Sequence, residues 1–385
     1  MNKFKFYFTV ITASVLFFSC SKDDNNGIDV EPPKDYTEQY EVEKVIIEDY
    51  LKENYIVVVD KPGFPEDQDI TISRIDAGQP SILSYLNATA YPKLLSRDAS
   101  MNGVTYKLYY LVLRPGVGIS PCNVDGVLAS YKGTYLNRSA TTATPPSELT
   151  ATFFEELKDP QTPFSLNSVI RGWGEIFPKF KTGETPTINP NGTVTYKDFG
   201  AGVMFIPSGL AYYNLGSGGI PAYAPLVFSF KLYNIVRLDQ DNDGVFSYQE
   251  DLNNDGYVYD FRNTTNYPTP PTTNPDDTDG DKIPDFLDVD DDGDNYTTRL
   301  EITKPVGINS GLSLYFPFDP IVDNPFTTVD ETETKGIPRK FTGPLLNPSL
   351  PETSTNLPTP QASDYTDPSR LRRHLDANCK PPYQN

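Results

Sequence analysis

The sequence predicts an α+β domain in the middle of the chain, built from a sheet that carries one short helix. Two observations lead to this class. Residues 104–113, 124–131 and 226–236 are rich in β-branched and aromatic side chains, which is typical of strands. Between the second and third of these runs, residues 168–180 have the apolar spacing of a helix.

The third run also predicts how its strand is buried. Leu226, Phe228, Phe230 and Leu232 alternate with less apolar residues. Successive side chains of a strand point to opposite faces, so we expect a half-buried strand over 226–236.

Upstream of this domain the pattern is helical and then mixed. Val42, Val45, Ile46 and Tyr50 lie three or four residues apart among charged residues, which predicts a helix over 39–54. Residues 55–100 alternate short apolar runs with turn formers, and their closeness to the central domain predicts an extension that packs on it.

Composition indicates one globular core with extended flanks. The chain has 385 residues, of which 37% are hydrophobic, and most of its 36 prolines lie outside the central third. The expected organisation is a signal peptide (1–19), a tether (20–37), an N-terminal extension (38–103), the central domain (104–237), acidic loops (238–303) and a Pro-rich C-terminal segment (304–385).

The net charge excludes two classes of partner. Arginine and lysine number 32 against 52 acidic residues, which gives −20 at pH 7. A polyanion is repelled by nucleic acid and by anionic lipid headgroups, so neither is expected to bind this chain directly.

The N-terminus predicts export and lipidation. Lys3 and Lys5 precede an apolar stretch over 6–18 that is too short to span a bilayer as a mature helix. Ser19 and Cys20 resemble a bacterial lipobox, and the polar residues after them resemble the tether of outer-membrane lipoproteins of Bacteroidetes. We therefore expect Cys20 to carry a lipid anchor in the outer membrane, facing the periplasm or the cell surface. The alternative is a secretory peptide with an incidental cysteine.

Cysteine and histidine usage excludes several chemistries. Apart from Cys20, the chain has only Cys122, Cys379 and His374. No zinc site, Ser-His-Asp triad or Cys-His pair can be built from them. Cys122 and Cys379 are equally compatible with a disulfide and with two free thiols.

Four blocks in the central domain occur in a specific order. They are Arg-Pro-Gly-Val-Gly at 114–118, Val-Leu-Ala-Ser-Tyr-Lys-Gly at 127–133, Val-Ile-Arg-Gly-Trp at 169–173, and Ile-Pro at 220–221 followed by Leu-Val-Phe at 226–228. Together they resemble the FKBP family over residues 104–237. The resemblance implies a bent antiparallel sheet wrapped around a short helix, with an aromatic pocket between them.

The resemblance also implies an activity, peptidyl-prolyl cis–trans isomerisation of proline-containing polypeptides by a protein that is expected to be a monomer. Rotation about an X-Pro bond is slow because the planar amide must lose its resonance. A dry pocket penalises the charge-separated planar amide relative to the twisted one, without a nucleophile. Trp173 would form the pocket floor, the N–H of Ile170 would hold a substrate carbonyl and the Tyr212 hydroxyl would donate. The implied walls are Tyr131, Phe154, Phe164, Val169, Ile170, Tyr212, Ile220 and Phe228, with Glu155 as the acid.

Three departures from the family pattern bear on activity. Residues 136–150 form an insertion rich in Thr, Ser and Pro, after which Phe154 and Glu155 occupy the positions of an aromatic residue and an aspartate. A second insertion lies around 187–201, and Tyr213 stands where a glycine normally follows the tyrosine. The alternative function is therefore a non-catalytic peptide-binding or surface-scaffold lipoprotein on a degenerate FKBP fold.

A first acidic loop at 239–250 fits the EF-hand pattern. Oxygen-bearing residues recur at alternate positions, a glycine stands at the sixth, and a glutamate closes the twelfth. Calcium favours this arrangement because it takes about six to eight oxygen ligands. The predicted ligands are Asp239, Asp241, Asp243, Val245 through its carbonyl, Ser247 and Glu250.

Further acidic segments follow the same spacing. A second loop has Arg262 at its twelfth position, so it is either incomplete or closed by Asp260, and residues 277–294 resemble a thrombospondin type 3 repeat. A third loop at 290–301 has Asn295 at its sixth position, where asparagine accepts left-handed backbone angles. The predicted ligands are Asp251, Asn253, Asp255, Asp277, Asp279, Asp281, Asp285, Asp288, Asp290, Asp292, Asp294 and Glu301.

These loops leave two alternatives open. An acidic run can be a solvated, disordered tail, but the regular spacing favours bound calcium that orders it. A calcium-dependent adhesion module would predict that the acidic segment binds a partner without the central domain.

Overall fold

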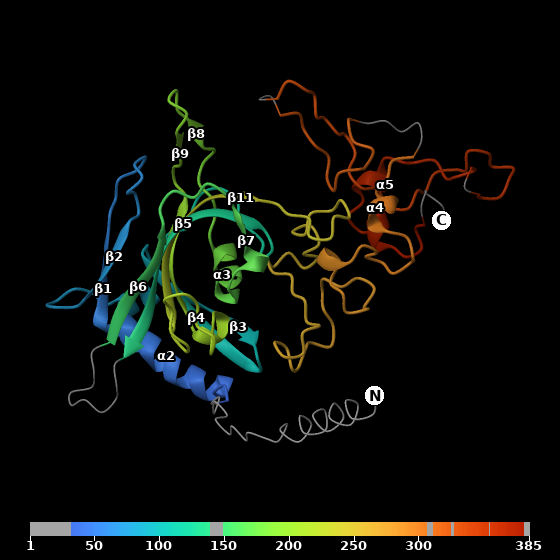
Figure 1. Cartoon of the computed structure of the whole chain (residues 1–385). Helices are drawn as coiled ribbons and strands as arrows, with labels where there is room; N and C mark the ends of the chain where they lie inside the picture. Colours follow the sequence, from blue (N-terminus) through green and yellow to red (C-terminus); the bar gives the residue numbers. More distant parts are fainter. Residues whose placement is uncertain (1–31, 139–148, 306–310, 325–326, 354, 381–385) are drawn as a thin grey trace, which may run out of the picture. The chain divides into compact units, whose positions relative to one another are not determined.

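The computed structural model describes residues 32–138, 149–305, 311–324, 327–353 and 355–380 (Figure 1). The predicted signal peptide, Cys20 and most of the tether lie outside the described residues. Residues 1–35 and 36–385 form two units, and all that follows concerns the second. No helix in the described ranges is long and apolar enough to cross a lipid bilayer.

A curled antiparallel sheet forms the centre of this unit, which confirms the α+β prediction. Its strand order is β3–β4–β10–β11–β5–β6, and β7 pairs with β5. The predicted strands correspond to β4, β5 and β11, whereas β3, β6, β7 and β10 were not predicted and β3 lies before residue 104. The bounds are β3 Lys93–Met101, β4 Val104–Arg114, β5 Gly126–Arg138, β6 Leu149–Leu157, β7 Phe164–Ser165, β10 Gly200–Ile206 and β11 Leu226–Val236.

A short helix lies inside the curl of the sheet (Figure 1). It is α3 (Arg171–Ile176), followed by the 3-10 turn η3 (Phe177–Lys179), and it matches the helix predicted for 168–180. Gly172 permits this packing, because a Cβ there would lie 2.5 Å from Cγ2 of Ile206 in β10. The short turns η2 (Leu166–Ser168) and η4 (Ser208–Leu210) adjoin α3 and β10.

The opposite face of the sheet is covered by the N-terminal extension. It comprises α2 (Tyr36–Glu53), β1 (Asn54–Val58), β2 (Ile70–Arg74) and η1 (Ile82–Asn87). A second apolar cluster joins Ile47 and Leu51 of α2 to Val227 of β11. The prediction of a half-buried β11 is therefore wrong, because both Val227 and Phe228 are buried.

The predicted helix at 39–54 exists, but its buried face differs from the one that the spacing indicated. Val42 and Val45 are 57% and 54% exposed, whereas Ile47, Tyr50 and Leu51 are buried. Packing against the sheet therefore decides which face of α2 is buried, and the helical spacing alone does not.

The C-terminal region has little regular structure. Its short elements are η5 (Asp285–Leu287), α4 (Thr298–Glu301), α5 (Ser363–Thr366) and η6 (Arg373–Leu375), and the small hairpin of β8 (Thr187–Ile188) and β9 (Val194–Thr195) lies in the second insertion. Val245, Ile302, Phe316, Ile337 and Phe341 form a separate buried cluster there. Cys122 and Cys379 are buried free thiols.

Candidate active site and metal-ligand loops

An aromatic pocket of 520 Å³ lies between α3 and the sheet. Of the ten residues that sequence predicts for the site, nine line it; Ile220 instead belongs to the buried core. Leu157, Ser168 and Ala211 also line the pocket and carried no sequence signal that singled them out. The lining residues are Tyr131, Phe154, Glu155, Leu157, Phe164, Ser168, Val169, Ile170, Trp173, Ala211, Tyr212 and Phe228.

Trp173 is the centre of the aromatic packing. Its ring lies 4.9 Å from that of Tyr131, 4.9 Å from that of Phe164 and 5.0 Å from that of Phe228, measured between centroids. The pairs with Tyr131 and Phe228 are edge-on, a favourable geometry for aromatic rings. The buried indole Nε1 of Trp173 has no hydrogen-bond partner among the described residues.

Glu155 occupies the acidic position beside the pocket. The Tyr131 hydroxyl donates a hydrogen bond of 2.9 Å to its Oε1. Burial, with the hydrogen bond and charge of Glu155, raises the pKa of Tyr131 to about 12. Tyr131 therefore stays protonated at neutral pH and keeps its donor on the glutamate.

Phe154 reaches the pocket wall because Gly133 stands opposite it. A Cβ at Gly133 would lie 2.4 Å from Cζ of Phe154 and 2.9 Å from Cε1 of Phe228. The neighbouring Phe153 is 55% exposed on the other side of β6. The Phe-Phe-Glu sequence thus presents Phe154 and Glu155 near the pocket and leaves Phe153 outside it.

Two donors stand at the rim of the pocket. The backbone N–H of Ile170, just before α3, donates no hydrogen bond within the described residues. Tyr212 follows η4, whose Ser208 N–H donates a bond of 2.6 Å to the buried Glu43 of α2. Tyr213, in the glycine position, has φ +43° and stacks on Tyr36 at 4.0 Å. Tyr213 thus stacks on α2 while its own backbone has a positive φ, which a glycine adopts more easily.

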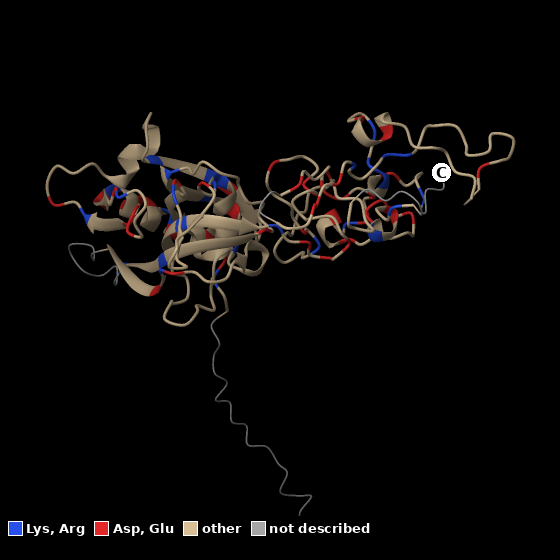
Figure 2. Ribbon diagram, turned by 90° about the horizontal axis from the view of Figure 1, so that it is seen from above, with Lys and Arg blue, Asp and Glu red and all other residues tan. Residues whose placement is uncertain are grey.

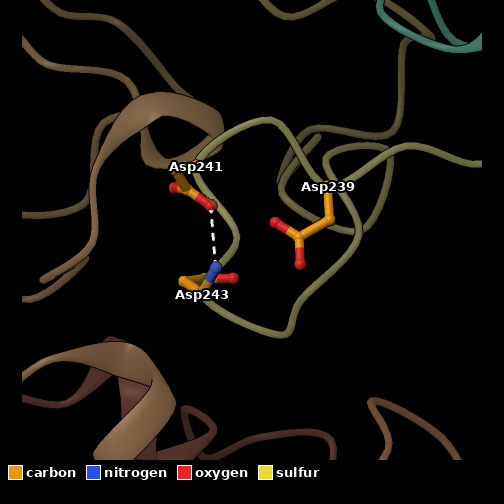
Figure 3. A group of neighbouring side chains, drawn as sticks. All are labelled: Asp239, Asp241 and Asp243. Carbon is orange, nitrogen blue, oxygen red and sulfur yellow. Dashed lines mark hydrogen bonds between the residues drawn. The ribbon is translucent and has the colours of Figure 1, made fainter.

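The first acidic loop (residues 239–250) folds around a group of carboxylates (Figure 3). Ligand oxygens of Asp239, Asp241 and Asp243 lie within 4.8 Å of one another. The carboxylate of Asp239 accepts hydrogen bonds from the N–H groups of Asn242 and Gly244, at 2.7 and 3.1 Å. These bonds turn the loop back on itself. Oδ2 of Asp241 and Oδ2 of Asp243 have no hydrogen-bond partner among the described residues.

Other predicted ligands of this loop occupy defined places. Val245 is fully buried in the C-terminal cluster, and its N–H donates to Oδ1 of Asp243 at 2.7 Å. The Ser247 hydroxyl accepts a bond of 3.2 Å from the N–H of Gln240. Glu250 is not grouped with Asp239 and Asp241. It groups with Asp243, which the two clusters share, and with Asp291.

Two further triads gather predicted ligands. They are Asp277, Asp279 and Asp281, which are mostly exposed, and Asp290, Asp292 and Asp294 at the start of the third acidic loop (residues 290–301). Asn295 in that loop has φ +73°, as its position predicts. In Figure 2 the red of Asp and Glu residues is concentrated along the ribbon of these loops.

The remaining predicted ligands are not brought into such groups within the described ranges. Asp251 and Asn253 accept bonds from the second loop's own backbone, and Asp255 does the same for Tyr257. Both oxygens of Asp285 accept bonds from Thr278, and Asp288 accepts one from the N–H of Asp290. Asp260, the alternative closing residue of the second loop, pairs with Arg262 at 2.8 Å.

Electrostatics in the loops favour a cation. Burial, followed by the charge of Asp243, raises the pKa of Asp241 to about 8. Burial raises the pKa of Asp243 to about 7 and, with Asp292, that of Glu301 to about 9. Grouped carboxylates whose charged forms are disfavoured are the donors that a hard divalent cation stabilises.

Sequence reasoning missed two buried aspartates. Asp291 lies between two predicted ligands, and Asp276 precedes the 277–281 triad. Asp276 is buried, and its Oδ1 accepts a bond of 3.1 Å from the N–H of Leu252 in the second loop. Neither fits the alternate spacing that identified the other ligands.

Sequence comparison relates part of this chain to known proteins. The chain is 32% identical over 154 residues to the FKBP-type peptidyl-prolyl cis-trans isomerase FkpA of Aeromonas hydrophila, which is 39% of this chain and 47% of that relative. Part of the chain is homologous to FKBP-type peptidyl-prolyl isomerases. The match spans about half the length of this relative.

Two solved structures and one family profile were also matched. A peptidyl-prolyl cis-trans isomerase of Pseudomonas syringae is 18% identical with a TM-score of 0.28, covering 54% of this chain and 100% of that one. FkpA of Escherichia coli is 28% identical with a TM-score of 0.24, covering 34% of this chain and 48% of that one. A family described as BamM C-terminal matches residues 240–329, which contain most of the first acidic loop and all of the third.

Proposed function

We propose that the chain is a peptidyl-prolyl cis–trans isomerase of FKBP type that assists the folding of exported proteins. The observation that carries the proposal is an aromatic pocket in which the rings of Tyr131, Phe164 and Phe228 all pack against that of Trp173. Homology to FkpA supports it.

The pocket suits this reaction because it is apolar and offers few polar groups. A planar X-Pro amide is more charge-separated than the twisted one, so a dry aromatic environment disfavours the ground state relative to the transition state. The N–H of Ile170 fixes the carbonyl of a bound peptide, and the Tyr212 hydroxyl donates at the opposite rim. No proton is transferred in this mechanism.

A protease-coupled isomerisation assay on the full chain tests the proposal. Trp173→Leu and Tyr212→Phe are expected to lower kcat/KM on the order of tenfold or more, which corresponds to about 1.4 kcal/mol of transition-state stabilisation. Phe153→Leu is the matched control, because it changes an aromatic residue next to the pocket wall that is exposed.

A folded protein without turnover would contradict the proposal. Binding of a proline-containing peptide by that protein, lost in Trp173→Leu, would then identify a non-catalytic peptide-binding module. Glu155 and Tyr213 are the positions where such a loss of activity would originate.

We further propose that calcium orders the acidic loops. The donor set fits the ion, since Asp241, Asp243, Asp292 and Glu301 each have a buried oxygen without a partner among the described residues. Limited proteolysis tests this proposal. Cleavage within 239–301 should be slow in calcium and fast in EGTA. Equal cleavage in both conditions contradicts the proposal.

The proposed location is the outer membrane, through a lipid on Cys20. The sequence around Cys20 supports this proposal. Metabolic labelling with a radioactive fatty acid should modify the wild-type chain and not Cys20→Ser, and unlabelled wild type would contradict it. The lipid-anchored chain is proposed to act as a monomer on exported clients.

A further inference from the structure

Three buried carboxylates join the first acidic loop to the third. One ligand oxygen from each of Asp243, Glu250 and Asp291 lies within 4.8 Å of the other two. Asp243 and Glu250 belong to the first loop, and Asp291 belongs to the third. This triad therefore connects two segments that are distant in sequence.

The three side chains are more deeply buried than the other triads. Asp243, Glu250 and Asp291 are 2%, 2% and 1% exposed. Oδ2 of Asp243 and both carboxylate oxygens of Glu250 and Asp291 have no hydrogen-bond partner in the described part of the chain. None of the ion pairs in the described part of the C-terminal region involves Asp243, Glu250 or Asp291. Buried carboxylates without partners are very unfavourable unless a cation neutralises them.

Packing brings the two loops together independently of these charges. Arg299 Nη1 in α4 donates a bond of 3.0 Å to the carbonyl of Asn242. Val245 of the first loop and Ile302, just after α4, belong to the same buried cluster. The triad is thus held by contacts that place both loops side by side.

The backbone also fixes where Asp291 lies. Its N–H donates to Oγ1 of the buried Thr298 at 3.3 Å, and the Thr298 N–H donates to the carbonyl of Val289 at 2.9 Å. Asp290 and Asp292 group with Asp294 in their own loop, whereas Asp291 groups with the first loop. The consecutive residues Asp290, Asp291 and Asp292 therefore belong to two different carboxylate clusters.

We propose that Asp243, Glu250 and Asp291 hold one calcium ion between the two loops. Asp291 is then a ligand that the third loop supplies to the first. Oxygen ligands at these positions and no nitrogen or sulfur donor favour calcium over transition metals. This inference rests on the proposed binding of calcium by the acidic loops, and it adds that one ion fastens the first loop, which follows β11, to the third loop and its helix α4.

The test compares the full chain with its Asp291→Asn variant. In calcium the variant should have the lower Tm, and calorimetric titration should show one calcium ion bound about 10- to 100-fold more weakly. In excess EGTA the variant should have the higher Tm, because it lacks one of three neighbouring buried carboxyl groups whose ionised forms repel one another. A merely structural role for Asp291 would lower the Tm under both conditions.

Two further variants sharpen the result. Glu250→Gln removes another charge of the same triad and should show the same reversal between calcium and EGTA. Glu331→Gln removes one exposed charge from the C-terminal region and should change neither measurement.

The outcomes separate this inference from the proposal beneath it. Unchanged calcium affinity of Asp291→Asn, or a lower Tm of that variant in EGTA, overturns the shared site while calcium binding by the wild type stands. A wild type that binds no calcium contradicts the proposed calcium function itself. Isomerase activity is measured separately and decides neither result.

Discussion

The Tyr257 hydroxyl donates a hydrogen bond of 2.8 Å to the backbone carbonyl of Glu175 in α3. The Glu175 carboxylate in turn pairs with Arg97 and Arg171, each at 2.8 Å, and accepts from the Tyr259 hydroxyl at 3.2 Å. The segment that follows the first acidic loop is thereby fastened to the helix that carries Trp173. Acidic loops and pocket are structurally coupled through α3.

This contact predicts that Tyr257→Phe destabilises the chain. The Glu175 carbonyl would lose a buried donor, which costs about 0.5–1.5 kcal/mol of unfolding free energy. Urea denaturation in calcium measures the change. Tyr91→Phe, at a half-exposed tyrosine on the N-terminal side, serves as control, and an equal effect of both substitutions would contradict the role of the bond.

Gly133→Ala should damage the pocket wall. The added methyl group would overlap the rings of Phe154 and Phe228, so both rings must move. Overpacking of this kind costs about 1–3 kcal/mol of stability, and we expect isomerase activity to fall as well. Gly219→Ala is the matched control, because a Cβ there meets no atom within 4 Å. Wild-type activity and stability in Gly133→Ala would show that the wall is pliable.

Glu155→Gln should lower the pKa of Tyr131. The wild-type pKa is raised to about 12 by burial first and then by Glu155, and the amide removes the negative charge but keeps an acceptor. Because the folded pKa lies above the ordinary value of about 10, this tyrosine contributes stability below pH 10 that is lost as the pH rises towards 12. NMR titration of ring-labelled tyrosine, assigned with Tyr131→Phe, measures the shift.

Glu156→Gln provides the comparison for that titration. Glu156 is adjacent in β6 but pairs with Lys158 instead of Tyr131, at 3.6 Å. A Tyr131 pKa that shifts as much in Glu156→Gln as in Glu155→Gln would show that the 2.9 Å bond does not control it.

Local patterns predicted β4, β5, β11 and α3 of the central domain, because these strand runs are long and strongly β-forming, but they did not predict β6, β7 and β10. The order of motif blocks also placed nine of the named residues in one pocket. Ile220 is the exception, because its side chain is buried in the core and does not line the pocket. Tertiary packing decides this placement, and local sequence does not. The strand β3 was missed because residues 93–101 mix charged and small residues with few apolar ones.

Local sequence patterns could not predict that the second face of the sheet is also covered. Alternation in residues 226–232 indicates one apolar face, but α2 and η1 bury the other through residues such as Val227. Val42 and Val45 fit the helical period as well as Ile47 does, so only the position of the sheet decides among them. Asp291 was missed for a related reason, because its cluster is completed by a loop far away in sequence.

His374 predicts a loss of stability in acid. The imidazole is buried beside the Phe318 ring, and its Nδ1 has no hydrogen-bond partner among the described residues. Burial, and then the charges of Arg372 and Arg373, lower its pKa to about 3.

The sign follows from linkage. Below pH 6.5, the ordinary pKa of histidine, His374 becomes protonated in the unfolded chain. In the folded chain it stays neutral down to about pH 3. The stability that neutral His374 contributes above pH 6.5 is thus lost as the pH falls, at about 1.4 kcal/mol per pH unit.

Urea denaturation of wild type and His374→Gln at pH 7.5, 5.5 and 4.5 measures this contribution. Glutamine does not titrate, so the variant should lose less stability than wild type between pH 7.5 and pH 4.5. The stability of the variant at pH 7.5 can differ from that of wild type because the packing changes. The test therefore compares how steeply the stability of each protein falls with pH. Titration of the acidic loops is common to both proteins and cancels in the comparison. Parallel slopes would mean that His374 is protonated within the folded chain, and hence that the C-terminal segment around η6 opens to water.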